Sequence, residues 1–206
     1  MSKFILGKKI GMTNLFRENG GVLGVTVIQA GPNTVVQVKT KDNDGYDAVQ
    51  IGFEEAREHR VTKPLRGHSR PAGGLFKHLR EFHVSGETSY QVGERLDAGL
   101  FEEGELVQVS AQSIGRGFQG VVKRHGFAGG PASHGHKNVL RRPGSIGSAF
   151  PQRVLRGLRM AGRMGNARVT IKNIPLVRID KERNLLFIEG SVPGKKGGLV
   201  EVMSRP

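Results

Sequence analysis

The chain has 206 residues, of which 32 are Lys or Arg and 18 are Asp or Glu, so its formal net charge is +14. This length suits one main domain with room for one insertion, and the charge favours a polyanionic partner, nucleic acid before an anionic membrane surface. The absence of Cys excludes disulfide scaffolds, thiolate zinc sites and cysteine nucleophiles, and no stretch approaches the ~20 apolar residues that cross a bilayer, so a cytoplasmic protein is expected.

Short β-rich runs lie on both sides of the middle of the chain. Asp44-Gly45 predicts a hairpin turn between two of them. The expected strands are residues 22–28, 34–38, 48–53, 106–109, 169–179, 185–189 and 198–203. Residues 169–179 form either two strands or one strand broken at Pro175. Strands at this spacing indicate a small barrel or sandwich to which both ends of the chain contribute.

Residues 54–85 show a different pattern. Leu75, Leu79 and Phe82 recur at helical spacing after Pro71, which predicts one short amphipathic helix within this insertion. We expect that helix to pack against the strands rather than to bind a ligand.

The positive charge is concentrated in one segment. Between Glu105 and Asp180 there is no acidic residue, whereas 13 positions are basic and ten of these are Arg. Outside this segment the two signs nearly balance, with 19 basic and 18 acidic residues. Arg binds phosphate bidentately and stacks on bases, and the twelve Gly of the segment allow its backbone to approach a phosphate chain. The segment therefore predicts an interface with a continuous polyanion.

The candidate RNA-binding residues are the cationic and imidazole side chains of this segment as far as Arg168. Arg153, Arg156, Arg159 and Arg163 share one face if their stretch is helical, but two intervening glycines weaken a helix, so an irregular basic limb is equally open. Imidazoles here would bind phosphate or stack on bases, and the three Phe either stack on bases or anchor the segment to protein. The set is Arg116, Lys123, Arg124, His125, His134, His136, Lys137, Arg141, Arg142, Arg153, Arg156, Arg159, Arg163 and Arg168.

Other kinds of site fit the segment less well. Gly115 to Gly120 match the G-x-G-x-x-G dinucleotide fingerprint, but the glycines that follow should break any helix, and no acidic residue occurs before Asp180 to hold a ribose. His134 and His136 suggest a metal site, yet the segment has no Cys or carboxylate to complete the ligand set. Its apolar runs are too brief for a membrane-surface helix. Because no catalytic constellation or P-loop stands out, we expect no enzymatic activity, cofactor, metal or small-molecule substrate.

Seven motifs run in order through nearly the whole chain. They are Ile5-Leu-Gly-Lys-Lys-Ile-Gly-Met-Thr13, Asp44-Gly-Tyr-Asp-Ala-Val-Gln50, Gly115-Arg-Gly-Phe-Gln-Gly120, Gly126-Phe-Ala-Gly-Gly-Pro-Ala-Ser-His-Gly135, Arg142-Pro-Gly-Ser-Ile-Gly147, Met160-Ala-Gly-Arg-Met-Gly165 and Val192-Pro-Gly194. Each motif is weak evidence alone. The ordered set resembles the bacterial ribosomal protein L-three family.

Together with the charge pattern, this resemblance implies a mainly β protein with a little α. We expect a small antiparallel β-barrel body (residues 1–110 with 167–206), a small helix-containing insertion (54–85) and a long basic Gly/Arg-rich extension (111–166). The resemblance implies a structural constituent of the large ribosomal subunit that binds large-subunit rRNA, nucleates assembly early and supports the peptidyl transferase centre through the extension. Neighbouring large-subunit proteins are further expected partners. The alternative is a general RNA chaperone or architectural nucleic-acid-binding protein.

Overall fold

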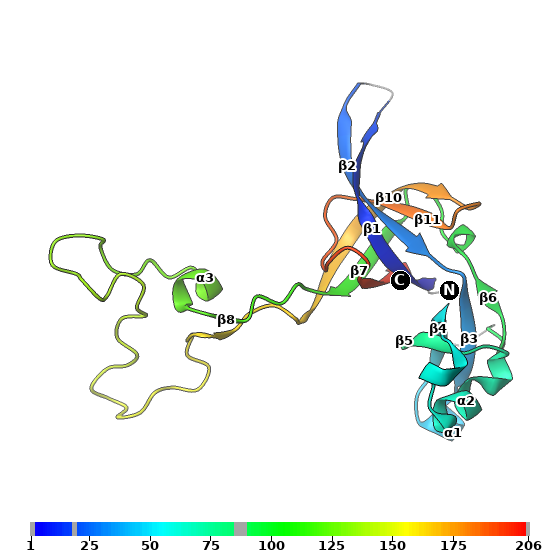
Figure 1. Ribbon diagram of the computed structural model, residues 1–206, viewed down its shortest axis with the longest axis horizontal. Coiled ribbons are helices and arrows are strands. Elements are labelled where there is room, and N and C mark those ends of the chain that lie inside the picture. The colour runs from blue at the N-terminus through cyan, green and yellow to red at the C-terminus, as the bar shows by residue number, and fades with distance from the viewer. Residues whose placement is uncertain (1–2, 18–19, 85–89, 205–206) are drawn as a thin grey trace. The chain divides into compact units, whose positions relative to one another are not determined.

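A computed structural model describes residues 3–17, 20–84 and 90–204. The chain divides into two units. The first, here called the body, is Met1–Gln112 with Arg168–Pro206, and the second, here called the arm, is Ser113–Ala167. Figure 1 shows the body as two β-sheets with short helices, and the arm as a mostly irregular chain in green and yellow.

The first sheet of the body is a closed barrel of six antiparallel strands. In order around the barrel they are β1 (Phe4–Phe16), β12 (Leu199–Ser204), β7 (Leu106–Gln112), β10 (Arg168–Asp180), β11 (Leu185–Glu189) and β2 (Val22–Ala30). Strands β7 and β10 pair as far as Gln112, which lies opposite Arg168. The arm therefore connects two residues that pair with one another on neighbouring strands of the barrel.

The second sheet of the body has four antiparallel strands. In order they are β5 (Phe76–His83), β4 (Ala48–Glu55), β3 (Asn33–Lys39) and β6 (Arg95–Leu96). Short helices connect the strands of the body: α1 (Lys41–Asp44), α2 (Lys63–Ser69) and the 3-10 turns η1 (Glu58–Arg60), η2 (Arg70–Ala72) and η3 (Ala98–Leu100). The described elements of the arm are β8 (Phe118–Gln119), α3 (Val121–His125) and β9 (Gly162–Arg163).

Strand β1 joins two hydrophobic cores because both faces of its first half are buried. Ile5 belongs to the core inside the barrel, whereas Phe4 and Leu6 belong to the core between the barrel and the second sheet. The rings of Phe4 and Phe82 stack with their centroids 4.7 Å apart. Each such buried side chain stabilises the fold by about 1.5–3 kcal/mol. The two sheets are thereby held as one unit.

The mainly β fold with an antiparallel barrel, expected from the sequence, is confirmed. All seven predicted strands are present. Residues 169–179 form one strand rather than two, and its register shifts between Ile171 and Ile174 and again between Leu176 and Arg178. The sequence did not predict β1, β5 or β6.

One local prediction is wrong, and a second differs in detail. Residues 75–82 do not form the expected amphipathic helix. Residues 76–83 instead form strand β5, on which Leu79 and Phe82 lie on opposite faces. The helix of the insertion is α2, and Ser85, its predicted last residue, lies outside the described residues. The hairpin expected around Asp44-Gly45 is present, since β3 and β4 pair antiparallel, but α1 connects the two strands and ends at Gly45, which adopts the left-handed conformation with φ of 82°.

Gly7 lies at a close approach of β1 and β2, which yields a first prediction. A Cβ atom at this position would be 2.6 Å from the backbone oxygen of Gln29 and from Ile28 Cγ2. We expect Gly7→Ala to lower the free energy of unfolding by about 1–3 kcal/mol, as measured by urea denaturation. Gly11→Ala on the same strand is the matched control, because a Cβ there meets nothing within 4 Å. Equal losses in both variants would contradict this packing argument.

An ion-pair cluster also joins the barrel to the second sheet. Lys8 Nζ of β1 lies 2.6 Å from Glu54 Oε1 of β4, and Lys77 Nζ of β5 lies 3.4 Å from the same oxygen. The hydrogen bond from Lys8 is the main cause that lowers the pKa of Glu54 below its ordinary value of 4.5, against the opposing effect of burial. The ionised carboxylate is therefore the form that the folded protein favours.

This lowered pKa yields a second prediction. The contribution of Glu54 to stability is complete above pH 4.5 and is lost as the pH falls through the lowered folded-state pKa. We expect Glu54→Gln to be less stable than the wild type at neutral pH by up to about 1 kcal/mol, since the paired side chains are about one-third exposed. The difference should shrink as the solution is acidified below pH 4.5. Thermal unfolding at neutral and acidic pH measures the stability difference between the two proteins. A difference that does not change with pH would contradict the ion-pair explanation.

Candidate nucleic-acid interface

The arm starts and ends as two limbs that pair with one another. Arg116 N donates to Met164 O at 2.9 Å, Met164 N donates to Gly117 O at 3.0 Å, and β8 pairs with β9 in antiparallel fashion. Gly165 has φ of 72°, and a Cβ on it would lie 2.1 Å from the carbonyl oxygen of Ile114. Glycine at this position therefore allows the two limbs to approach.

Helix α3 carries a contact between the two limbs, here called the clamp. Arg124 Nη1 donates to Met160 O at 2.7 Å, and His125 Nε2 lies 3.0 Å from the same oxygen. Because a carbonyl only accepts hydrogen bonds, this contact requires the hydrogen of His125 to be on Nε2. The guanidinium of Arg124 occupies the space beside Gly162, where a Cβ would be 2.7 Å from Nη1. Val121 of α3 is 2% exposed and is the one buried side chain described in the arm.

The loop of residues 127–144 encloses a hollow. Gly130 N donates to Leu140 O at 3.0 Å and closes the loop. The hollow has a volume of about 860 Å³, and its lining includes Phe127, His136 and Arg142. An aromatic ring, an imidazole and a guanidinium therefore share one concave surface, a combination that suits an unstacked nucleotide.

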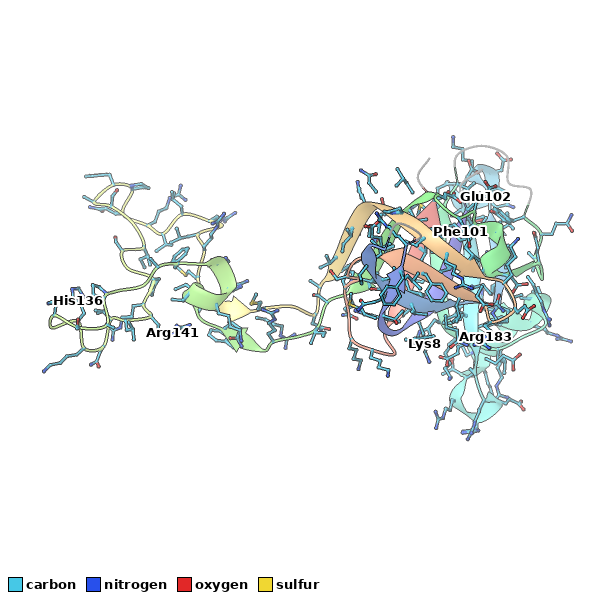
Figure 2. All side chains as sticks on the ribbon, turned by 90° about the horizontal axis from the view of Figure 1, so that it is seen from above. Lys8, Phe101, Glu102, His136, Arg141 and Arg183 are labelled. Atoms are coloured by element: carbon cyan, nitrogen blue, oxygen red, sulfur yellow. The ribbon has the colours of Figure 1, made fainter. Side chains whose placement is uncertain are left out.

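Most of the predicted RNA-binding side chains are exposed. Figure 2 shows the side chains of the arm projecting outward from its backbone, with His136 and Arg141 on the loop. Of the fourteen predicted residues only Arg124 and His125 are half-buried, and both form the clamp. Since the arm contains no Asp or Glu, its cations have no carboxylate within the arm to pair with.

The limb that carries the row of arginines is irregular. Residues 145–160 form bends and turns without a helix, so Arg153, Arg156 and Arg159 do not share a helical face. Phe118 is 77% exposed and Phe150 is 80% exposed. These two rings are accessible to a partner and do not anchor the arm to the described part of the chain.

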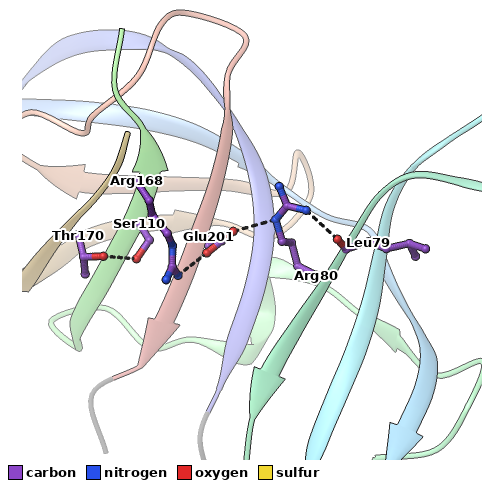
Figure 3. Close-up of polar contacts among 6 residues, drawn as sticks. All are labelled: Leu79, Arg80, Ser110, Arg168, Thr170 and Glu201. Atoms are coloured by element: carbon purple, nitrogen blue, oxygen red, sulfur yellow. Dashed lines mark hydrogen bonds and ion pairs between the residues drawn. The ribbon is translucent and has the colours of Figure 1, made fainter. Parts of the chain in front are cut away.

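Arg168 differs from the other predicted residues because its charge is balanced within the body. Its Nη2 donates to Glu201 Oε2 at 2.6 Å, and Arg80 Nε donates to Glu201 Oε1 at 3.0 Å (Figure 3). The Glu201 side chain is 16% exposed and lies between the two guanidinium groups. Beside this pair the hydroxyl oxygens of Ser110 and Thr170 are 2.8 Å apart. Sequence reasoning missed Arg80 and Glu201, because contacts across 121 and 33 residues leave no local pattern.

The described residues also bear on the metal, dinucleotide and membrane sites that fitted the sequence less well. Among these residues no three His, Asp or Glu side chains are grouped so that they could hold a metal ion. A helix does follow the glycines of the G-x-G-x-x-G match, so the expectation that none would form there is wrong. That helix, α3, has five residues, and the first acidic residue after it is still Asp180. None of the helices described is both long and apolar enough to span a membrane.

Known proteins resemble this chain over almost its full length. The family model for Ribosomal protein L3 matches residues 87–186. Large ribosomal subunit protein uL3 of Herpetosiphon aurantiacus is 53% identical over 199 residues, which cover 96% of this chain and 94% of the relative. The uL3 proteins of Synechococcus sp. (strain JA-3-3Ab) and Geobacillus kaustophilus are 53% and 50% identical over 205 residues each, covering 98% and 99% of this chain and 95% and 96% of the relatives.

Identity of this extent over both chains leaves no doubt about the relationship, and it includes the barrel, the insertion and the arm alike. The chain belongs to the ribosomal protein L3 family.

Proposed function

We propose that this chain is a structural constituent of the bacterial large ribosomal subunit, works in the cytoplasm, and binds large-subunit rRNA through the arm without catalysing a reaction. The observation that carries the proposal is the charge of the arm, which has ten Lys or Arg and no Asp or Glu. Such a surface needs counter-charges from outside the chain, and the phosphates of a folded RNA supply them at close spacing. The relatives are named as large ribosomal subunit proteins.

The proposed contacts differ in their chemistry. The exposed arginines bind phosphates bidentately or stack on bases. Phe118 and Phe150 stack on unpaired bases, and the hollow beside Phe127 receives an unstacked nucleotide whose phosphate meets Arg142. Arg124 and His125 serve mainly to hold the limbs together, since both already bond to Met160.

Further partners follow from the family. Neighbouring large-subunit ribosomal proteins are proposed to contact the chain. An early role in assembly and support of the peptidyl transferase centre by the arm are carried by the family resemblance. Both functions require that the arm keep one shape inside the RNA, for which the paired limbs and the clamp provide the framework.

Deletion of the arm tests the main proposal. Because Gln112 and Arg168 face one another in the barrel, Asn-Gly can replace residues 113–167 as a type I′ hairpin turn. We expect the wild type to prefer large-subunit rRNA over an unrelated structured RNA, and the deletion variant to lose that preference. Binding is measured across a salt series, where ten phosphate contacts would give a log-log slope of up to about 7 to 9.

Two outcomes would overturn the proposal. Equal and steeply salt-dependent binding of the wild type to both RNAs would favour a general RNA chaperone. An arm-deleted protein that folds, as shown by its circular dichroism and unfolding transition, and still prefers large-subunit rRNA would place the specific contacts outside the arm.

A variant that conserves charge tests the clamp. Gly162→Ala should displace the Arg124 guanidinium, whose end is flexible, and so remove the hydrogen bond to Met160. We expect about a tenfold loss of rRNA affinity, about 1.4 kcal/mol, near the lower limit for a hydrogen bond from a charged group. The salt slope should not change, because every charge remains. Gly147→Ala is the control, since its Cβ would meet nothing within 4 Å. Tighter binding by Gly162→Ala would instead assign Arg124 to direct RNA contact.

A further inference from the structure

The body carries a second concentration of positive charge that the sequence analysis did not identify. Without the arm, 22 basic and 18 acidic residues remain. Residues 57–70, between β4 and β5, contribute five of these basic residues and one acidic residue. The rest of the body has 17 of each sign, so the whole positive excess of the body lies in these fourteen residues. This segment is here called the basic insertion.

One cation of the basic insertion maintains its shape. Arg66 Nη1 donates to Glu58 Oε1 at 2.7 Å, and Arg66 Nη2 donates to the Glu58 backbone oxygen at 2.6 Å. Arg66 Nε donates to Val61 O at 3.3 Å. Ser69, at the end of α2, is 2% exposed and attaches the other end of the segment to the fold. The single carboxylate of the insertion is therefore already engaged, and the backbone that carries the other cations is held in place.

The other four cations of the basic insertion have no balancing charge. Arg57, Arg60, Lys63 and Arg70 are exposed, and none of them forms an ion pair with any residue that the structure describes. Elsewhere in the body, one cation on each of four strands has a carboxylate partner, namely Lys8 on β1, Lys39 on β3, Arg80 on β5 and Arg168 on β10, whereas Lys172 and Arg178 on β10 have none among the described residues. Four unpaired cations within fourteen residues, with no free carboxylate among them, create a local positive potential that attracts a polyanionic partner.

The surface beside these cations is concave. A hollow of about 440 Å³ is lined by Arg57, Arg60 and Lys77 together with the apolar side chains of Val61, Leu65 and Phe76, and Glu55 also borders it. Leu65 is 44% exposed although it is apolar. Guanidinium groups next to an accessible apolar wall suit a sugar-phosphate chain, in which phosphates alternate with less polar ribose and base faces.

We propose that the basic insertion is a second RNA-binding surface, separate from the arm, in which Arg57, Arg60, Lys63 and Arg70 contact backbone phosphates. Three of the four are Arg, whose planar fork matches phosphate and is more weakly hydrated than the ammonium of Lys. The RNA is taken to be large-subunit rRNA, which rests on the proposed function. Contact at two separate sites would fix the orientation of the protein on the RNA, because a protein that is bound at one site only can still rotate about that site.

A charge-removal experiment on the full chain tests this surface. Arg57→Gln, Arg60→Gln, Lys63→Gln and Arg70→Gln are combined in one variant, which leaves Arg66 and its contacts to Glu58 intact. The control combines Lys181→Gln, Arg183→Gln, Lys195→Gln and Lys196→Gln, four exposed cations of the body that also form no ion pair with the described residues. Both variants lose the same net charge from the same unit.

The expected result is a loss specific to the basic insertion. Four phosphate contacts at about 0.7 to 0.9 each should reduce the log-log salt slope for large-subunit rRNA by about 3, while the control variant stays close to the wild type. Equal reductions in both variants would show that net charge alone matters and would overturn the proposal. If the wild type itself did not prefer large-subunit rRNA, the proposed function would fail instead, so the two failures are distinguishable.

A second measurement identifies the partner directly. Because the chain has no Cys, His59→Cys on η1 provides a single attachment point for an iron-EDTA probe in assembled large subunits. We expect hydroxyl radicals to cleave the rRNA backbone at a discrete set of nucleotides near this position. Absence of cleavage, together with cross-linking of the same Cys to a neighbouring protein, would assign the basic insertion to an acidic protein partner and refute the RNA proposal.

Discussion

The arm carries ten positive charges on 55 residues and no negative charge. This imbalance determines which part of the chain can provide a stable fold. Repulsion between like charges opposes collapse, and the arm buries too little apolar surface to offset it, since Val121 is its one buried side chain among those described. The body must therefore supply the stability of the free protein. It does so with two cores that share strand β1. The arm is held by a few backbone hydrogen bonds, glycines that permit close contact and the clamp.

The same charge pattern allowed the arm to be predicted from the sequence, whereas some strands of the body were not predicted. Runs of β-rich residues predicted seven strands, and all seven are present. Many strands with one face in a core and the other in solvent also alternate in polarity. Strand β1 lacks this alternation because Phe4, Ile5 and Leu6 are all buried, in two different cores. On β5, Leu79 and Phe82 lie on opposite faces of the strand, and their spacing imitates that of a helix.

The residue types of the candidate site could be predicted from the sequence, but the contacts among these residues could not. Exclusion of acidic residues identified the segment, and the structure leaves most of its arginines exposed. The clamp joins residues 35 and 36 positions apart through a backbone carbonyl, which no residue pattern encodes. Arg168 looked like its neighbours in the sequence, yet Glu201 of β12 balances its charge. The basic insertion was not identified from the sequence, because Glu54, Glu55 and Glu58 lie beside or within it and lower its local net charge. In the structure Glu54 pairs with Lys8 and Lys77 outside the insertion, and Glu58 pairs with Arg66 alone, which leaves the other four cations unbalanced.

The facing positions of Gln112 and Arg168 make the molecule modular. A segment inserted between two paired residues changes in length without shifting the register of either strand, so the hydrogen bonds of the barrel are unaffected. Each doubling of such a segment costs only about 0.6 kcal/mol in loop-closure entropy. The arm can therefore become longer or shorter, and so reach a partner at a different depth, while the barrel keeps the same architecture.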